Sequence, residues 1–593
     1  MNALRTLLPY YRPYRWTLVL GLTLVVLSAA FTSVVPWLLR AAIDDMRAGA
    51  PIGHTWTIAG EMLVLALLGG GARFGMRQVL NTMSRHLEFD LRNALFARLE
   101  TMDAPYYTRM RTGDLMARLT NDLSAVRMAA GPALMYLTNT IAGGIFALAF
   151  MLHVDLRLTA IALLPMVFLP YVMARMGRAI HTRFEAVQAH FGALTTLAQE
   201  NLAGVRIVRA YRQEAPEVRR FEVLNEQYLE KNMHLVWLYG AMNPLLVLLA
   251  GLGTVVVLGF GGMLVVRGTI TVGAFVAFGF YLAILTWPMI ALGWVTNLFQ
   301  RGAASMGRLN EILNARPAVA SPEFPRELPP TAGGRAVEFR HVSFHYPVPE
   351  GGERRWVLRD VSFFIPAGGT LGIVGATGSG KSALMDLLPR FFDPQEGEIL
   401  VDGVPIRTLA LDTLRSEIGY VPQESLLFSD TIGSNLGYGA AEGASTQWAV
   451  HVAQLEETIA AFPGGLETML GERGINLSGG QKQRAALARA LARRPSIVML
   501  DDALSAVDTH TEAAILHALR EALSARTALI ASHRVSAIRD ASWIIVLDEG
   551  RIVEQGRHTD LLALGGRYWS LLNRQQLVEA IEEDEAEPAG AGD

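Results

Sequence analysis

The chain has 593 residues, no Cys and a net charge of -3, and 51% of its residues are hydrophobic while only 18% are charged. It is too long for one ordinary domain and too apolar for a soluble protein. The lack of Cys excludes a disulfide framework, a thiolate metal site and a cysteine nucleophile. We therefore expect a membrane protein that also carries a soluble part.

Six apolar runs in the first half of the chain are each long enough to cross a bilayer as a helix, which takes about 20 residues. One such run could be a buried core helix, but six in succession favour a membrane domain. The second run contains Glu61 and Arg73, which either face a cavity or a partner or lie at the ends of the span. The predicted spans are 16–39, 57–76, 131–153, 158–174, 241–266 and 271–298.

Arginine is concentrated before the first span and in the connections 77–130 and 175–240, whereas the other connections are short and poor in cations. Cytoplasmic loops hold the excess of cations, so both termini are predicted to be cytoplasmic. The two Arg-rich connections are long enough to form protrusions beyond the membrane, with turns predicted at 112–115 and 211–216. Segment 4–16, with three Tyr among cations, suits a helix in the membrane interface.

The second half of the chain is polar and differently patterned. A Pro-rich stretch predicts a linker at 301–335, after a transmembrane domain at 1–300. Alternating strand-like and helical runs then predict an α/β domain at 336–575, and the acidic end at 576–593 predicts a disordered tail. The predicted fold is an α-helical membrane domain with six transmembrane helices, followed by an α/β domain.

A phosphate-binding loop lies in this α/β domain. An apolar strand at 371–374 runs into Gly-Ala-Thr-Gly-Ser-Gly-Lys-Ser and then into a helical run, so that backbone N–H groups and a helix N-terminus can converge on phosphate. Lys381 is placed to reach the terminal phosphates and Ser382 to ligand Mg²⁺. A second apolar strand ends at Asp501, which either helps to hold the metal or merely caps the next turn. The loop residues are Gly375, Ala376, Thr377, Gly378, Ser379, Gly380, Lys381 and Ser382.

The sequence Leu-Ser-Gly-Gly-Gln at 477–481, followed by Lys-Gln-Arg, resembles the signature motif of ATP-binding cassette (ABC) proteins. With the phosphate loop, Asp501 and the six spans in the same order, the resemblance to ABC exporters covers nearly the whole chain. It implies a P-loop nucleotide-binding domain with ATP and Mg²⁺ as cofactors, and it likens the two predicted turns to coupling helices. It also implies that Ser478, Gly479, Gly480 and Gln481 bind the ATP held by an opposing subunit.

The same resemblance assigns roles to residues for which the local sequence alone predicts no function. It implies that Tyr346 stacks on adenine, that Gln423 ligands Mg²⁺ and takes part in catalysis, and that His533 contacts the terminal phosphate. It places Glu472 in the loop before the signature and 505–508 in the D-loop. Each of these residues alone would suit ordinary packing or capping, so their order along the chain carries the assignment.

One position departs from the family pattern. The family normally has Glu directly after the metal-associated Asp, where it polarises the attacking water, and this chain has Asp502. The carboxylate is withdrawn by about 1.5 Å, one C–C bond, and errors of about 1 Å can cost on the order of 10²-fold in rate. The chain thus resembles the degenerate half of heterodimeric bacterial multidrug exporters. A homodimer that hydrolyses ATP slowly stays open.

The resemblance further implies a multi-pass translocase of the cell inner membrane that exports apolar or amphipathic compounds. Its expected partners are a second half-transporter with Glu at the catalytic position, membrane lipid and a hydrophobic small molecule, but no nucleic acid. A homodimeric lipid or lipopeptide flippase is the alternative, and an ATP-gated regulator without transport is a further one. Lys occurs only at positions 231, 381 and 482, and only at Lys381 does the site demand a compact ammonium.

Overall fold

The computed structural model describes residues 2–331, 333–348, 353–440, 445–471, 474 and 476–586. The chain divides into two compact units. The first consists of Met1–Thr101 and Arg111–Ala315, and the second of Met102–Met110 and Arg316–Asp593. The first unit holds every predicted span, and the second holds the predicted α/β domain together with a short piece of the first protrusion.

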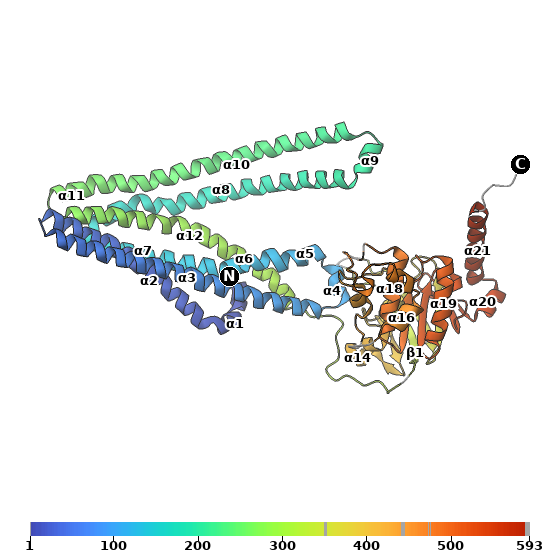
Figure 1. Cartoon of the computed structure of the whole chain (residues 1–593). Helices are drawn as coiled ribbons and strands as arrows, with labels where there is room; N and C mark the ends of the chain where they lie inside the picture. Colours follow the sequence, from blue (N-terminus) through green and yellow to red (C-terminus); the bar gives the residue numbers. More distant parts are fainter. Residues whose placement is uncertain are drawn as a thin grey trace. The chain divides into compact units, whose positions relative to one another are not determined.

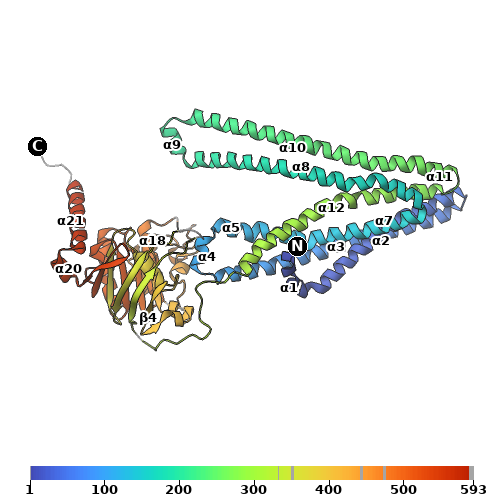
Figure 2. The same cartoon turned by 180° about the vertical axis from the view of Figure 1, so that it is seen from behind.

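The first unit is helical (Figure 1). Helices α8 and α10 lie side by side as a long pair joined by α9, as Figures 1 and 2 both show. Pi-helical turns interrupt the longer helices at three described places, η3, η4 and η5. The helices are η1 (Asn2–Leu7), α1 (Leu8–Tyr11), η2 (Arg12–Tyr14), α2 (Arg15–Arg47), α3 (Ile52–Glu100), α5 (Thr112–Ala117), η3 (Arg118–Asp122), α6 (Leu123–Met128), η4 (Ala129–Ala133), α7 (Leu134–Val154), α8 (Leu156–Ala203), α9 (Val205–Ala210), α10 (Glu214–Val256), η5 (Val257–Gly261), α11 (Gly262–Val266) and α12 (Val272–Leu313).

All six predicted spans fall on helices of this unit. Among the described residues, five helical stretches are long and apolar enough to cross a membrane. The fourth predicted span, 158–174, lies in α8, where the apolar stretch found is the shorter Leu156–Pro165 and several further side chains lie outside the described residues. The five stretches are Ala3–Arg47, Ile52–Glu100, Thr112–Val154, Glu214–Val266 and Val272–Leu313.

The break in the first protrusion lies earlier than the sequence suggests. Residues 112–115 begin helix α5 instead of forming a turn, with Asp114 in the first helical turn, where an acid suits the helix dipole. The break is formed around α4 (Ala104–Arg109), which belongs to the second unit. The Asp103 carboxylate accepts hydrogen bonds from Tyr106 N at 3.2 Å and Val319 N at 2.8 Å, and Ala104 packs against the core of that unit.

The second protrusion breaks where the sequence predicts, between α9 and α10 at 211–213. Pro216 lies just inside α10, in the first turn, where the missing N–H has no helical partner to lose. The N-terminal segment 2–14 is helical, and it packs on its own unit: Leu7 is buried, and the Tyr11 hydroxyl donates to Ala130 O at 2.6 Å.

Two helices extend past domain boundaries that are predicted from the composition of the sequence, at residues 300 and 575. Helix α12 continues beyond residue 300 to Leu313, because Met306, Leu309 and Ile312 recur at helical spacing and are fully buried. Helix α21 (Arg567–Ala586) runs well into the segment predicted to be disordered. Charge alone suggests disorder there, but Ala, Glu and Leu are also strong helix formers. Residues 587–593 lie outside the described residues.

The second unit contains two sheets (Figure 2). A four-stranded antiparallel sheet has the order β2-β1-β4-β5, and a six-stranded sheet has the order β10-β9-β3-β8-β7-β6. In the second sheet only β10 is antiparallel to its neighbour. The strands are β1 (Val337–Phe344), β2 (Leu358–Ile365), β3 (Thr370–Gly375), β4 (Glu396–Val401), β5 (Val404–Pro405), β6 (Ile418–Val421), β7 (Ile497–Asp501), β8 (Thr527–Ser532), β9 (Trp543–Asp548) and β10 (Arg551–Gly556).

Helices cover these sheets and complete two hydrophobic clusters, one between the sheets and one under the signature helix α18. The helices of this unit are α4, α13 (Lys381–Leu387), η6 (Ile406–Thr408), α14 (Leu411–Ser416), α15 (Ile432–Leu436), α16 (Gln447–Val452), α17 (Glu456–Ala460), η7 (Gly465–Glu467), α18 (Gly479–Ala492), α19 (Thr509–Leu523), η9 (Val535–Ala537), α20 (His558–Leu564) and α21.

The order of the parallel strands decides where the predicted site residues meet. Strands β3, β8, β7 and β6 are consecutive neighbours and run in one direction, so their carboxyl ends share one edge of the sheet. The phosphate loop follows β3, His533 follows β8, Asp501 ends β7, and Gln423 comes two residues after β6. Segments distant in sequence are thereby brought to the same edge.

Candidate nucleotide-binding site

One cavity of the second unit collects most of the predicted site residues at this edge. The remaining loop residues, Gly375, Ala376 and Ser379, lie in the same loop but not on the cavity wall. The four signature residues are not among the described residues that line it. The predicted residues that line the cavity are Tyr346, Thr377, Gly378, Gly380, Lys381, Ser382, Gln423, Asp501, Asp502 and His533.

The phosphate loop needs glycine for its backbone shape and for close packing. Gly378 and Gly380 have φ angles of +82° and +105°, which side-chain-bearing residues rarely adopt. A Cβ atom on Gly380 would lie 2.8 Å from Leu358 Cδ2 and 3.0 Å from Val357 O. The Ser379 hydroxyl is buried and has no hydrogen-bond partner among the described residues. The loop thus presents backbone N–H groups at the start of α13.

Lys381 is buried at the base of the loop. Its ammonium donates to Gly375 O at 2.7 Å and to Ala376 O at 3.1 Å, and it lies 3.3 Å from His533 Nδ1. Burial lowers the pKa of Lys381, while the nearby carboxylates of Asp502 and Asp501 act in the opposite direction. The compact ammonium of Lys381 is therefore held by backbone carbonyl groups of the phosphate loop.

Asp501, Ser382 and Gln423 form an oxygen-rich set that fits Mg²⁺. Burial raises the pKa of Asp501, and a hydrogen bond from Ser382 opposes that rise. Carboxylate, hydroxyl and amide oxygens are ligands that Mg²⁺ accepts, and Mg²⁺ commonly uses one or two carboxylates together with substrate phosphates. No cluster of three or more His, Asp or Glu suited to a metal occurs among the described residues.

Asp502 lies against the loop that carries His533. Its Oδ1 accepts a hydrogen bond from His533 N at 3.3 Å, and its Oδ2 lies 3.6 Å from His533 Nε2. The backbone of Asp502 has a φ of +50°, a left-handed conformation that Asp adopts more readily than most residues. The short carboxylate is therefore directed at His533, on the wall of the cavity.

Tyr346 contributes an aromatic ring to the lining of the cavity. Phe344 and Phe392 contact it edge-on, with ring centroids 5.0 and 5.2 Å away. Burial raises the pKa of Tyr346 to about 12, so the phenol is neutral near pH 7. A neutral ring held by its neighbours suits stacking on a base.

The signature forms the N-terminus of helix α18. Ser478 Oγ accepts a hydrogen bond from Gln481 N at 3.3 Å, and Gln481 Oε1 accepts one from Ser478 N at 2.9 Å, which makes a capping box. Gln483, one turn further, donates to Ser505 Oγ at 2.9 Å and accepts from Ala506 N at 2.9 Å, and so ties the signature helix to the D-loop. Glu472 lies outside the described residues.

Sequence reasoning missed Asp386, which lies behind this site on α13. The Tyr420 hydroxyl donates to Asp386 Oδ1 at 3.2 Å. Burial raises the pKa of Asp386 to about 6, and the charge of Asp501 adds to the rise. An acid within the otherwise apolar run 383–388 is the one sequence signal that could have pointed to it.

The raised pKa of Asp386 predicts a pH-dependent cost. The folded pKa is about 6 and the unfolded value 3.8, so stability falls as pH rises between about 4 and 6, while the buried carboxyl ionises. We expect Asp386→Asn to stabilise the protein by about 1–2 kcal/mol at pH 7.5, after allowing for partial exposure, and by little at pH 4. The check is the apparent melting temperature at both pH values, with the exposed Asp412→Asn as control. A gain equal at both pH values would contradict the shift.

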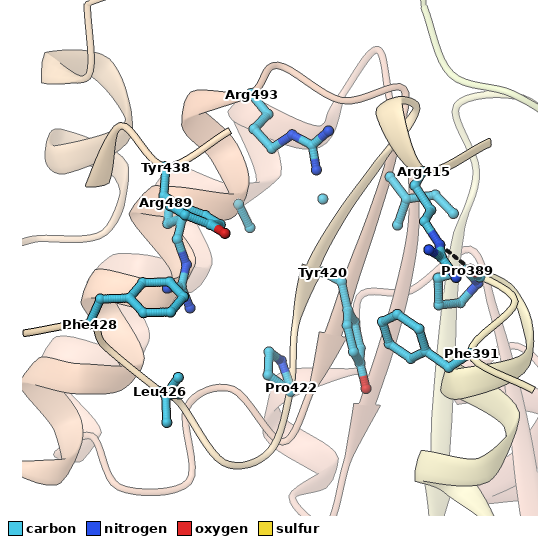
Figure 3. Close-up of a pocket in the computed structure, with 13 residues that line it drawn as sticks. Pro389, Phe391, Arg415, Tyr420, Pro422, Leu426, Phe428, Tyr438, Arg489 and Arg493 are labelled. Carbon is cyan, nitrogen blue, oxygen red and sulfur yellow. Dashed lines mark hydrogen bonds between the residues drawn. The ribbon is translucent and has the colours of Figure 1, made fainter. Parts of the chain in front are cut away.

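A second cavity is lined in part by residues of β6 (Figure 3). Tyr420, whose hydroxyl reaches Asp386, here lies beside Phe391 and Pro422. Three Arg and no Asp or Glu line this cavity among the described residues. Its lining residues are Pro389, Phe391, Arg415, Ile418, Gly419, Tyr420, Pro422, Leu426, Phe428, Tyr438, Arg489, Ala490 and Arg493.

Comparison with known proteins assigns the chain to a family. A family model described as the ABC transporter transmembrane region matches residues 18–289, and one described as ABC transporter matches residues 358–505. A Bacillus subtilis (strain 168) protein named "Probable multidrug resistance ABC transporter ATP-binding/permease protein YheI" is 39% identical over 589 residues, 98% of this chain and 99% of that protein. The chain belongs to the ABC transporter family. Its ATP-binding domain therefore implies an ATPase coupled to transport.

Other relatives of this ABC transporter are equally full-length. "Multidrug resistance-like ATP-binding protein MdlA" of Escherichia coli (strain K12) is 35% identical over 97% of each chain, and "ATP-dependent lipid A-core flippase" of Syntrophus aciditrophicus (strain SB) is 32% identical over 98% of this chain and 96% of that one. A solved structure of a bacterial Atm1-family ABC exporter with ATP bound matches with a TM-score of 0.76 at 30% identity, covering 95% of this chain and 98% of that chain. These matches confirm the predicted fold, a multi-pass membrane domain followed by a nucleotide-binding domain, and the exporter class.

Proposed function

We propose that this chain is one half of a heterodimeric exporter that moves apolar or amphipathic compounds out of the cytoplasm or the inner leaflet. Its partner is a different half-transporter with Glu at the position of Asp502. The multidrug-resistance relatives support the substrate class. The distribution of Arg supports an inner-membrane protein with both termini in the cytoplasm.

The presence of Asp502 where the family has Glu is the observation that most supports a heterodimer. A general base must reach the proton that it removes, and the Asp502 carboxylate is held by the His533 backbone at 3.3 Å. Because the side chain is one methylene shorter than Glu, ATP at this chain's own loop is hydrolysed slowly. The capped signature helix is intact, so this chain can still complete a competent site on its partner.

The residues of this chain divide the work at its own site. Tyr346 stacks on adenine, the loop N–H groups and Lys381 bind the phosphates, and His533 contacts the terminal phosphate. Asp501, Ser382 and Gln423 would hold Mg²⁺, which would neutralise phosphate charge. At the partner's site, Ser478 and the N-terminus of α18 bind the terminal phosphate while the partner's Glu accepts the proton of the attacking water. Attack on the terminal phosphorus breaks its bond to the bridging oxygen and releases ADP and phosphate.

The decisive experiment is ATP turnover by the purified full-length chain in lipid nanodiscs. We expect the chain alone to turn over on the order of 10²-fold more slowly than a competent exporter, because its base is displaced. We also expect turnover to recover when a half-transporter with Glu at the catalytic position is purified together with it. Rapid turnover by the chain alone would contradict the heterodimer and leave a homodimer.

A lipid flippase is the second candidate, and the similarity to the lipid A-core flippase of Syntrophus aciditrophicus supports it. The same turnover assay separates the two. Stimulation by lipopolysaccharide or a phospholipid, with no response to apolar drugs, would favour a homodimeric flippase over the exporter proposed here.

A further inference from the structure

The loop that carries His533 is held by residues at the ends of strands β7 and β8 and by helix α19. The backbone N–H of His533 donates to Asp502 Oδ1 at 3.3 Å, and the N–H of Arg534 donates to Ser532 Oγ at 2.9 Å. Glu512 of α19 accepts a hydrogen bond from the Arg534 side chain. The carbonyl of His533 and the N–H of Val535 take no part in these contacts.

Gln575 of the C-terminal helix α21 binds both of these groups with one side chain. Its Oε1 accepts from Val535 N at 2.9 Å, and its Nε2 donates to His533 O. An amide carries a donor and an acceptor on one planar group, and only this orientation satisfies both partners. Gln575 therefore clamps the backbone on both sides of Arg534, directly behind the candidate catalytic histidine.

Helix α21 is a firm support for such a clamp. Tyr568 in its first turn is fully buried, in a cluster that also contains Val535 and Ile538 of the following segment. Glu554 accepts a hydrogen bond from Tyr568 N at 2.9 Å and another from Arg567 N, which fixes the start of the helix. Gln575 is two turns further along this anchored helix.

We propose that Gln575 is a positioning residue that sets the contact of His533 with the terminal phosphate, and that α21 thereby determines how strongly this site prefers ATP over ADP. The inference rests on the proposed role of His533. Displacing a contacting group by about 1 Å is enough to weaken a directed interaction. Tyr346 is proposed to stack on adenine, which ATP and ADP share, so loss of the clamp should leave ADP binding unchanged.

The test is equilibrium binding of ATP and ADP to the full-length chain in lipid nanodiscs, measured by displacement of a fluorescent ATP analogue. This readout does not depend on hydrolysis. We expect Gln575→Ala to lower the ATP-over-ADP preference about fivefold, the effect of one net hydrogen bond. Gln575→Glu should lower it at least as much, because it keeps the acceptor for Val535 but turns a carboxylate towards the carbonyl of His533. The neighbouring, exposed Gln576→Ala is the matched control and should leave the preference unchanged.

A double variant distinguishes positioning from general stability. If Gln575 acts through His533, Gln575→Ala should have no further effect on the preference in a His533→Ala background. Additive losses, equal losses for ATP and ADP, or an unchanged preference in Gln575→Ala would each overturn the clamp. An unchanged preference in His533→Ala itself would overturn the proposed role of His533 and with it the basis of the inference.

Discussion

Replacing Asp502 by Glu should raise ATP turnover of the purified chain by about 10- to 100-fold. The added methylene carries the carboxylate about 1.5 Å further, and positional errors of about 1 Å can account for a rate difference on the order of 10²-fold. In the structure the shorter carboxylate contacts the backbone N–H of His533 at 3.3 Å and lies 3.6 Å from its ring. Single-turnover ATP hydrolysis in nanodiscs measures the change in the chemical step directly.

Two controls make this prediction specific. Asp412→Glu makes the same change of side chain at an exposed position and should leave turnover unaltered. The melting temperature should also be recorded, because the φ of +50° at position 502 suits Asp better than Glu and some stability can be lost. Unchanged turnover in a folded Asp502→Glu protein would mean that side-chain length is not what limits this site.

The site could be predicted from the sequence wherever local structure determines it. The strand, loop and helix around Lys381 are consecutive in the chain, and Asp501 ends an apolar strand, so each of the two features follows from its own short segment. That Gln423 and His533 share their edge depends on the neighbour order β3-β8-β7-β6, which short-range patterns do not encode. The family resemblance supplied those two residues.

What the sequence could not provide are contacts made across the fold. Asp386 reads as one acid in a helical run, and only its burial beside Tyr420 and near Asp501 gives it a raised pKa. In the sequence, Gln575 is one of several polar residues near the C-terminus, and nothing local predicts a contact for it. Only the packing of α21 places it against the loop that carries His533. The composition that suggested a disordered tail is compatible with a helix once one face is anchored.

Replacing Lys381 by Arg should weaken ATP binding by about 10- to 100-fold, the effect of losing a hydrogen bond to a charged group or of overfilling a packed site. The Lys381 ammonium is buried and donates to Gly375 O at 2.7 Å and Ala376 O at 3.1 Å, inside a loop whose backbone is constrained by Gly378 and Gly380. A planar guanidinium is larger and presents its donors in a fork, so it cannot reproduce this arrangement. Displacement of a fluorescent ATP analogue measures the affinity.

Lys482 provides the matched control for this change, because it directly follows the signature and is only half-buried. Its backbone N–H bonds Ser478 O at 3.0 Å as any residue of the helix would, so Lys482→Arg should leave ATP affinity unchanged. Equal losses in both variants would show that the chain tolerates Arg poorly for a general reason. Unchanged affinity in Lys381→Arg would contradict the inference that the phosphate loop accepts only a compact ammonium at this position.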